Sequence, residues 1–457
     1  MKIIVVGCGK IGKAVISSLV AEGHDVVAID DNPNTVTEIT DVYDVMGVCG
    51  NGADFDTLKE ANVSDAEMFV AVTGSDELNM LSCFIAGRMG VRHTIARIRN
   101  PEYNDTGLDF MRQQLGLSMS INPEQLVAEE IYNILKLPSA VRIENFSRRN
   151  FEMVELKLAN DSELDGMSLI KMREKYKAKY LICTVRRGDE VYIPDGRFVL
   201  RGGDRIGLTA LHTEIEKLLK MLGVLQRQAK NIMILGGGKT TYYLAKMLSG
   251  VGGSNVKIIE KERKVCENLS TDLPKSVIIH GDGANQELLL EEGISSMDAF
   301  VSLTGMDEEN IMISIFAAMQ SVPKVIAKIN RDELLPMAGK LGVETIISPT
   351  EITASILVRY ARALENSYGS NVETLYKLMD GHAEALEFNV SEKSTITNIP
   401  LKDLKLRKNT LIAGITRGRK TIIPSGDDMI LSDDKVIIIC ANYRLQDLDD
   451  ILDGGRG

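Results

Sequence analysis

The sequence of 457 residues lacks tryptophan, and its six cysteines form no CxxC pair. Scattered cysteines of this kind indicate buried free thiols in a reducing compartment. The sequence has no run of about 18 apolar residues, so we expect no membrane-spanning helix. Met1 and Lys2 lead directly into a strand-like apolar run without a signal-peptide cleavage region, which predicts a cytoplasmic protein.

Recognisable catalytic motifs are also missing. None of the five histidines falls at an HExxH or other metal-binding spacing, and there is no GxSxG. We therefore expect no metal site. No evident pair of a histidine and an acid stands ready for hydride transfer. The sequence favours a protein that is not an enzyme.

Basic residues are outnumbered, since 53 Lys and Arg against 64 Asp and Glu give a net charge of −11. This balance argues against a nucleic-acid partner, which requires a basic face. The apolar fraction of 44% is ordinary for a soluble globular protein, and the length suits two to four domains.

Short motifs recur along the chain at a nearly constant offset. GNGA at 50–53 returns as GDGA at 281–284, and TGSD at 73–76 returns as TGMD at 304–307, both 231 residues later. Order and spacing hold to the end of the chain, which indicates an internal duplication of about 228 residues.

Each copy divides again. Strand-like segments at 2–6, 25–29, 44–48, 67–72 and 93–98 alternate with amphipathic stretches such as 10–22 and 76–89, which predicts a doubly wound parallel sheet. Capping signals at Asn122-Pro123 and Ser348-Pro349 predict helices running to about 136 and 363. Strands at 151–158, 180–185 and 205–208 predict a small α+β module after the sheet. The fold class is therefore α/β, with two Rossmann-like sheets each followed by a small module, and the expected domains are 1–137, 138–225, 229–365 and 366–457.

The first glycine turn fits G-x-G-x-x-G between a strand and a helix. Its residues are Gly7, Cys8, Gly9, Lys10, Ile11 and Gly12. The helix N-terminus offers free amides and a partial positive charge to a phosphate. Asp30, which closes the next strand, is suited to ribose hydroxyls, and Asp30 and Asp31 together would repel a 2′-phosphate, so NAD or an adenine nucleotide is favoured over NADP.

The second turn is related but altered. It contains Gly236, Gly237, Gly238, Lys239 and Thr240, with Glu260 at the following strand end, and Thr241 stands where the first turn has Gly12. A side chain there is expected to push the helix away from the strand, which puts the second site's function in doubt. Gly238-Lys239-Thr240 resembles the end of a P-loop, but Met233 stands where the loop needs its first glycine.

Further candidate contacts lie at the carboxyl ends of the strands, where doubly wound sheets bind ligands. They are Asn51, Gly52, Thr73 and Arg97 in the first copy, and Asp282, Thr304 and Lys328 in the second. Arg97 is suited to a phosphate. Asp282 replaces Asn51 and makes the second site more acidic.

GCGKIG, Asp30, GNGAD, TGSDELNM, IARIRNPEY and YIPDGRFVLRGGDRI, in this order and twice over, resemble the tandem RCK/KTN family of peripheral regulatory subunits of Trk/Ktr-type potassium uptake systems. The resemblance covers essentially the whole chain. It implies a non-enzymatic subunit on the cytoplasmic face of the cell membrane that gates an integral membrane potassium channel subunit. It further implies a tetramer with a ring of eight nucleotide domains, and NAD(H) and ATP or ADP as competing ligands. An NAD-dependent oxidoreductase and an NAD-binding scaffold without a channel partner stay open as alternatives.

Overall fold

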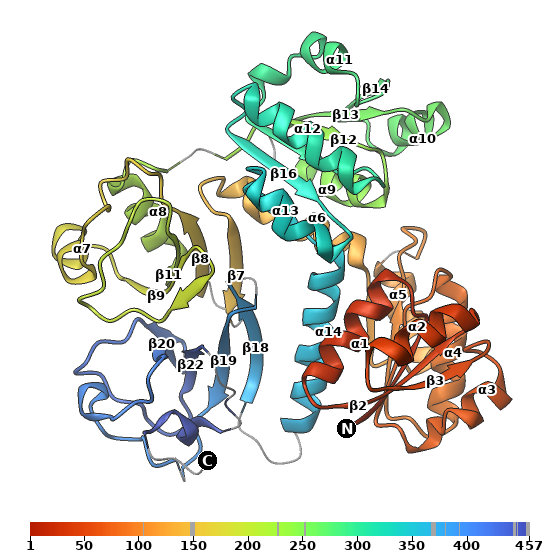
Figure 1. Ribbon diagram of the computed structural model, residues 1–457, viewed down its shortest axis with the longest axis horizontal. Helices are drawn as coiled ribbons and strands as arrows, with labels where there is room; N and C mark the ends of the chain where they lie inside the picture. Colours follow the sequence, from red (N-terminus) through yellow and green to blue (C-terminus); the bar gives the residue numbers. More distant parts are fainter. Residues whose placement is uncertain are drawn as a thin grey trace. The chain divides into compact units, whose positions relative to one another are not determined.

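The computed structural model describes residues 1–103, 105–146, 151–225, 228–250, 253–366, 372–379, 381–392, 394–441, 445 and 447–453 (Figure 1). The chain divides into two compact units, each made of two separate stretches. The first unit combines Met1–Leu135 with Ala229–Val358, and the second combines Lys136–Gln228 with Arg359–Gly457. The four domains expected from the repeat are a division of the sequence and stay a prediction.

The first sheet is parallel, in the order β3-β2-β1-β4-β5-β6. Its central strands are buried on both faces, which explains their unbroken Val, Ile and Ala content. The strands are β1 (Lys2–Val6), β2 (Asp25–Asp30), β3 (Met46–Cys49), β4 (Met68–Ala71), β5 (His93–Arg97) and β6 (Met119–Ile121). The helices are α1 (Lys10–Ala21), α2 (Pro33–Val42), α3 (Phe55–Glu60), α4 (Asp76–Arg88), α5 (Asp105–Leu115) and α6 (Pro123–Lys136), with the 3₁₀ turn η1 (Val63–Asp65).

The second sheet repeats this topology as β14-β13-β12-β15-β16-β17. Its strands are β12 (Asn231–Leu235), β13 (Asn255–Glu260), β14 (Val277–His280), β15 (Ala299–Ser302), β16 (Lys324–Lys328) and β17 (Thr345–Ile347). The helices are α9 (Lys239–Gly250), α10 (Arg263–Asp272), α11 (Gln286–Glu291), α12 (Asp307–Met319), α13 (Leu335–Lys340) and α14 (Pro349–Asn366), with η2 (Ile294–Ser296) and η3 (Asp332–Leu334).

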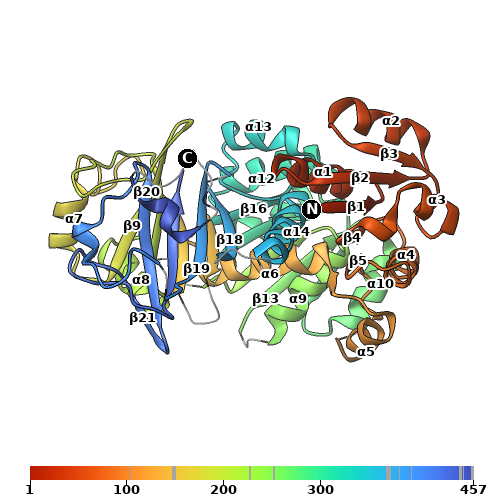
Figure 2. The same ribbon diagram turned by 90° about the horizontal axis from the view of Figure 1, so that it is seen from below.

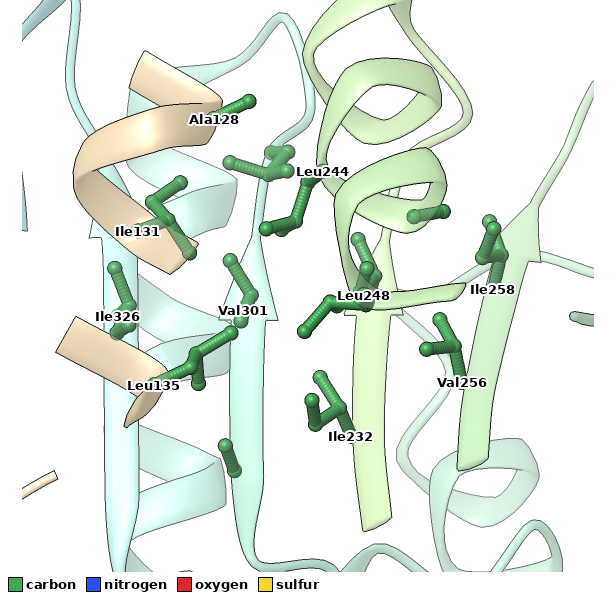
Figure 3. Packing of buried hydrophobic residues seen from close by; sticks show 14 of the residues in the cluster. Ala128, Ile131, Leu135, Ile232, Leu244, Leu248, Val256, Ile258, Val301 and Ile326 are labelled. Atoms are coloured by element: carbon green, nitrogen blue, oxygen red, sulfur yellow. The ribbon is translucent and has the colours of Figure 1, made fainter. Parts of the chain in front are cut away.

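Helix α6 follows the first sheet in the sequence but packs on the second. Ala128, Ile131 and Leu135 form one apolar face of α6, as expected from their spacing of three and four residues. In Figure 3 this face lies against Val301 of β15 and Ile326 of β16, and all five residues belong to one buried cluster. The core of the second sheet is thus completed by a helix from the first copy.

The small modules are antiparallel sheets in the matching orders β10-β9-β11-β8-β7 and β18-β19-β22-β20-β21. Buried side chains from both sheets, including Met153, Cys183, Leu378 and Ile437, form one shared core, and Figure 2 shows β9 beside β20. The first module contains β7 (Arg142–Phe146), β8 (Phe151–Lys157), α7 (Leu169–Lys175), β9 (Tyr180–Arg187), β10 (Glu190–Tyr192), β11 (Arg205–Leu211) and α8 (His212–Met221). The second contains β18 (Val372–Leu378), β19 (Ala383–Asn389), η4 (Leu401–Asp403), β20 (Thr410–Arg417), β21 (Lys420–Ile422), β22 (Lys435–Cys440) and η5 (Leu448–Ile451).

The expected fold class is confirmed: two Rossmann-like parallel sheets are each followed by a small module that contains an antiparallel sheet. Within the described ranges, no helix has the length and apolar character needed to span a membrane. The cysteines are free thiols, but the expectation that they are buried is wrong for Cys49, which is exposed at the end of β3.

Candidate functional site

The first glycine turn connects β1 to α1 under tight steric limits. Gly7 has a φ of +88°, and a Cβ there would lie 2.7 Å from the amide nitrogen of Thr73. A Cβ on Gly12 would lie 1.9 Å from the carbonyl oxygen of Gly7. Gly9 caps α1 without a side-chain hydrogen bond, and the first turn of α1 contains no acid. The amides and the positive end of the helix dipole are therefore left to an outside acceptor.

Asp30 joins the end of β2 to this turn. Its Oδ2 accepts from the Cys8 amide at 2.7 Å, and its Oδ1 accepts from the Asn32 amide at 3.0 Å. The carboxylate thus fixes the turn and lines the cavity described below. Cys8 points into the protein instead, where burial, followed by the charge of Asp30, raises the pKa of its thiol to about 12.

A buried amide holds the ends of β4 and β5 together. The Oδ1 of Asn79 accepts from the amide of Thr73 at 2.8 Å and from its hydroxyl at 2.7 Å, while Nδ2 donates to the carbonyl of Arg97 at 2.9 Å. Asn310 makes the same bonds to Thr304 and Lys328. Sequence reasoning missed these two asparagines, although their recurrence in TGSDELN and TGMDEEN was a signal.

The turn opens into a cavity of about 610 Å³ at the carboxyl ends of the first sheet. Nine of the residues expected in the first site line it, namely Gly7, Gly9, Lys10, Ile11, Asp30, Asn51, Gly52, Thr73 and Arg97. Cys8 and Gly12 stand behind the lining. The second copy also contributes to this cavity, through Thr240, Lys328, Asn330, Pro349 and Thr350. Thr240 and Lys328 were expected in the second site, yet they line the first cavity, and their role as ligand contacts stays a prediction.

Two cationic side chains from different copies meet in this cavity. Arg97 lies 3.6 Å from Glu124, and its Nε is buried without a hydrogen-bond partner among the described residues. Burial lowers the pKa of Arg97, although the charge of Glu124 opposes this shift. Burial likewise lowers the pKa of Lys328, whose Nζ donates to the Leu303 carbonyl at 3.1 Å. Both cations are partly desolvated, which strengthens their attraction for an anion.

The backbone of the second turn follows the same course as that of the first, but the side chains around it make different hydrogen bonds. Gly236 has a φ of +94°, and the amide of Gly237 donates to Oε2 of Glu260 at 2.5 Å. Thr241 is fully buried, and its hydroxyl donates to the carbonyl of Gly236 at 2.5 Å. The threonine is therefore accommodated by a hydrogen bond across the turn that Gly12 cannot make.

The second turn is also more acidic. Asp282 is exposed, with its Oδ1 accepting from the Ala284 amide at 3.0 Å. Glu309 stands where the first copy has Leu78, and burial followed by the charge of Asp282 raises the pKa of Glu309. Gly236, Gly237, Gly238, Lys239, Glu260, Asp282 and Thr304 lie around this turn and do not line the 610 Å³ cavity. Of the residues that do, sequence reasoning missed Leu78 and Glu124 of the first copy and Asn330 and Thr350 of the second. Nothing local indicates that Asn330 and Thr350 meet the first copy.

Comparison with known proteins identifies both halves of each copy. The family model of the TrkA-N domain matches residues 3–123 and 232–349, and the model of the TrkA-C domain matches residues 153–223 and 385–453. A Trk system potassium uptake protein TrkA homolog of Methanosarcina mazei is 32% identical over 96% of this chain and 97% of its own length. The Trk system potassium uptake protein TrkA of Vibrio alginolyticus is 31% identical over 97% of this chain and 96% of its own length.

A solved structure titled GsuK channel bound to NAD shares the fold, with a TM-score of 0.63 and 17% identity over 96% of this chain and 76% of that one. Family models cover most of the chain, and the two relatives align over nearly their full length. The chain therefore belongs to the TrkA family of Trk system potassium uptake proteins.

Proposed function

We propose that this chain is a nucleotide-sensing regulatory subunit without enzymatic activity, which gates an integral membrane potassium channel or transporter subunit of the Trk/Ktr type. It acts from the cytoplasmic face of the membrane, and its ligands are NAD(H) and ATP or ADP, which compete. The names of its relatives support a role in potassium uptake. The structural neighbour bound to NAD supports a nucleotide as the ligand of this fold.

One observation carries the proposal: the first cavity is lined by both copies. Asp30, Arg97 and Lys328 line it with the N-terminus of α1. In the proposed site Asp30 accepts from the ribose, and the positive groups bind the phosphates. A nucleotide held there contacts the first sheet through Gly9 and the second through Lys328. Its binding free energy therefore depends on how the two sheets are arranged.

Helix α6 provides a path from the ligand to the fold. Its first residues, Pro123 and Glu124, line the cavity, and its apolar face, with Ile131 at the centre, is buried on the second sheet. A ligand that draws Arg97 toward phosphate weakens the pair between Arg97 and Glu124. Ligands with different numbers of phosphates then favour different positions of α6, which is the condition for gating by competing nucleotides.

Assembly into a tetramer forms part of the proposal. Helices α4 and α12 expose apolar side chains, with Leu81 at 50%, Met312 at 63% and Met319 at 75% exposure. The same helices also have buried apolar residues, so they are apolar on more than one side. A second copy of the chain covers these faces in a ring.

Titration with fluorescently labelled ADP and NAD tests the ligand assignment, since the chain has no tryptophan to report binding. Asp30→Ala removes a charged hydrogen-bond acceptor and should weaken binding by about 1.5–3 kcal/mol. Glu260→Ala is the matched change at the second turn and should leave nucleotide binding in the first cavity intact. Unchanged affinity in Asp30→Ala would show that the first cavity is not the nucleotide site.

Hydrogen exchange tests the path to α6. Protection of residues 123–136 should differ between the NAD-bound and ATP-bound states. Equal protection with and without either nucleotide would exclude α6 as the moving element. Potassium flux through a co-reconstituted channel subunit, measured with each nucleotide, then tests gating directly.

A further inference from the structure

A second cavity, of about 490 Å³, lies in the same unit away from the glycine turns. It is lined by the loop after β5, by α5, β6 and α6 of the first copy, and by α9 and Ile356 of α14 of the second. Its apolar wall includes Ile98, Leu108, Met119 and Leu126. No residue of the nucleotide site proposed above lines it, so it needs a separate explanation.

Two tyrosines of α9 form the aromatic wall of this cavity. The rings of Tyr242 and Tyr243 meet edge to face, with centroids 5.5 Å apart and planes at 76°. The hydroxyl of Tyr243 accepts from Nδ2 of Asn122 at 3.0 Å and donates to the carbonyl of Arg99 at 3.1 Å. Tyr243 is thereby fixed, while the Tyr242 ring makes no such hydrogen bond to the described residues. The faces of these two rings favour a flat ring as the ligand.

The cavity also has positive charge that the protein does not fully use. The Nε of Arg112 is buried with no hydrogen-bond partner among the described residues. Its two other contacts, Nη1 to Asp109 and Nη2 to the Ser118 carbonyl, are both long at 3.5 Å. An arginine with such weak contacts has donors for a carboxylate, which matches the guanidinium fork.

Lys246 adds a second cation to the wall. Its Nζ lies 5.7 Å from the centroid of the Tyr242 ring, and it has no ion pair with a carboxylate of the described residues. Two acids also line the cavity: Asp109 is 72% exposed, and Glu129 accepts from Gln125 at 3.0 Å. The formal charges of the lining therefore cancel, and the Nε of Arg112 is the buried donor left for a ligand.

The two copies differ at the positions that supply the aromatic and cationic side chains of this cavity. When the two copies are aligned on their glycine turns, the α9 residues fall opposite small or unrelated residues of α1. When they are aligned on Gly116 and Gly342, Arg112 of α5 falls opposite a buried alanine of α13. The pairs are Tyr242 with Lys13, Tyr243 with Ala14, Lys246 with Ser17, and Arg112 with Ala338. Both copies have thus diverged at positions that meet in one cavity.

We propose that this cavity is a second ligand site, which binds a small aromatic carboxylate. Arg112 holds the carboxylate through Nε and a neighbouring Nη, Lys246 adds charge at the rim, and the ring lies against Tyr242 and Tyr243. The site acts separately from the nucleotide cavity.

Indole-3-acetate is the probe for this site, because its emission is visible in a chain without tryptophan. We expect saturable binding to the full chain, equal with and without excess NAD, and much weaker binding of the neutral indole-3-acetamide. Arg112→Gln should weaken indole-3-acetate binding about tenfold or more. Arg263→Gln, which changes an arginine that is 81% exposed on α10, is the matched control and should bind like the wild type.

Three results would overturn the proposal: no saturable binding at millimolar probe, displacement of the probe by NAD, or equal affinity of Arg112→Gln and the wild type. Tyr242→Leu provides a second variant, since it removes the ring and keeps an apolar side chain. It should also weaken binding of the probe while leaving the circular dichroism spectrum unchanged. Retained probe affinity in a folded Tyr242→Leu protein would equally overturn the proposal.

Discussion

Replacement of Gly12 by alanine tests how closely α1 approaches the first turn. A Cβ at this position would lie 1.9 Å from the carbonyl oxygen of Gly7, which is far inside the contact distance. Helix α1 must then move away from β1 by more than an ångström. Overpacking of this kind costs about 1–3 kcal/mol. For a unit of this size, such a loss lowers the melting midpoint by roughly 2–10 °C.

The second copy shows how the chain adapts to a side chain at this position. A Cβ on Gly236 would lie 3.1 Å from the nearest atoms of Leu303 and Thr304, whereas one on Gly7 would lie 2.7 Å from Thr73. The second turn is therefore slightly looser where Thr241 replaces the glycine. Gly12→Ala should loosen the first turn in the same manner, which weakens nucleotide binding and lowers stability together.

Gly9→Ala is the matched control within the same motif. Gly9 has a φ of −68°, and a Cβ there meets nothing within 4 Å, so the melting midpoint should fall less than in Gly12→Ala, by the cost of a poorer N-cap alone. The methyl group that Gly9→Ala adds would face the cavity, so the main effect of this variant should be weaker nucleotide binding. Differential scanning fluorimetry and labelled-ADP titration of both variants separate the two effects. A wild-type midpoint for Gly12→Ala would refute the close-approach reasoning.

Three further predictions concern charge and buried polar groups. Arg97→Gln should weaken ADP binding about tenfold or more, because a cation of the cavity is lost, whereas Arg263→Gln should not; equal affinities in a titration would contradict this. Asn79→Leu leaves the Thr73 amide and the Arg97 carbonyl without their partner, and it should lower the free energy of unfolding by about 3 kcal/mol in urea titrations. A decrease below about 1 kcal/mol would argue against the hydrogen-bond network. Burial lowers the pKa of Lys324 from 10.5 to about 8, so between these values the unfolded chain holds a proton that the folded chain has lost. Stability should therefore rise with pH across this window, and Lys324→Met should remove that rise in urea midpoints; an identical slope in both proteins would contradict it.

Much of the fold could be predicted from the sequence because local patterns determine it. The apolar run at 2–6 forms β1 (Lys2–Val6), and the Asn122-Pro123 signal marks the start of α6 (Pro123–Lys136) as expected. The expected strand at 44–48 begins later, at Met46, because Val45 donates to the Tyr43 carbonyl in a turn instead of joining the sheet. Boundaries thus depend on single hydrogen bonds that periodicity does not contain.

The partners of these elements could not be predicted. The spacing of Ala128, Ile131 and Leu135 shows that α6 has an apolar face, yet it says nothing of which sheet covers that face. The same limit applies to the cavity. Lys328 is recognisable as the counterpart of Arg97 through the repeat, but its place beside the first glycine turn follows from the packing of one copy on the other.

The position of α6 on the second sheet has a consequence for the evolution of the protein. A fragment that ends after α6 would carry Ile131 and Leu135 as an apolar stripe without the surface that covers it in the full chain. Each such fragment must bind another molecule that offers a similar sheet, and its most available partner is its own copy. The fused gene therefore converts an association that depends on concentration into an intramolecular one. Once fused, the two halves were free to diverge, because every first half always meets the same second half.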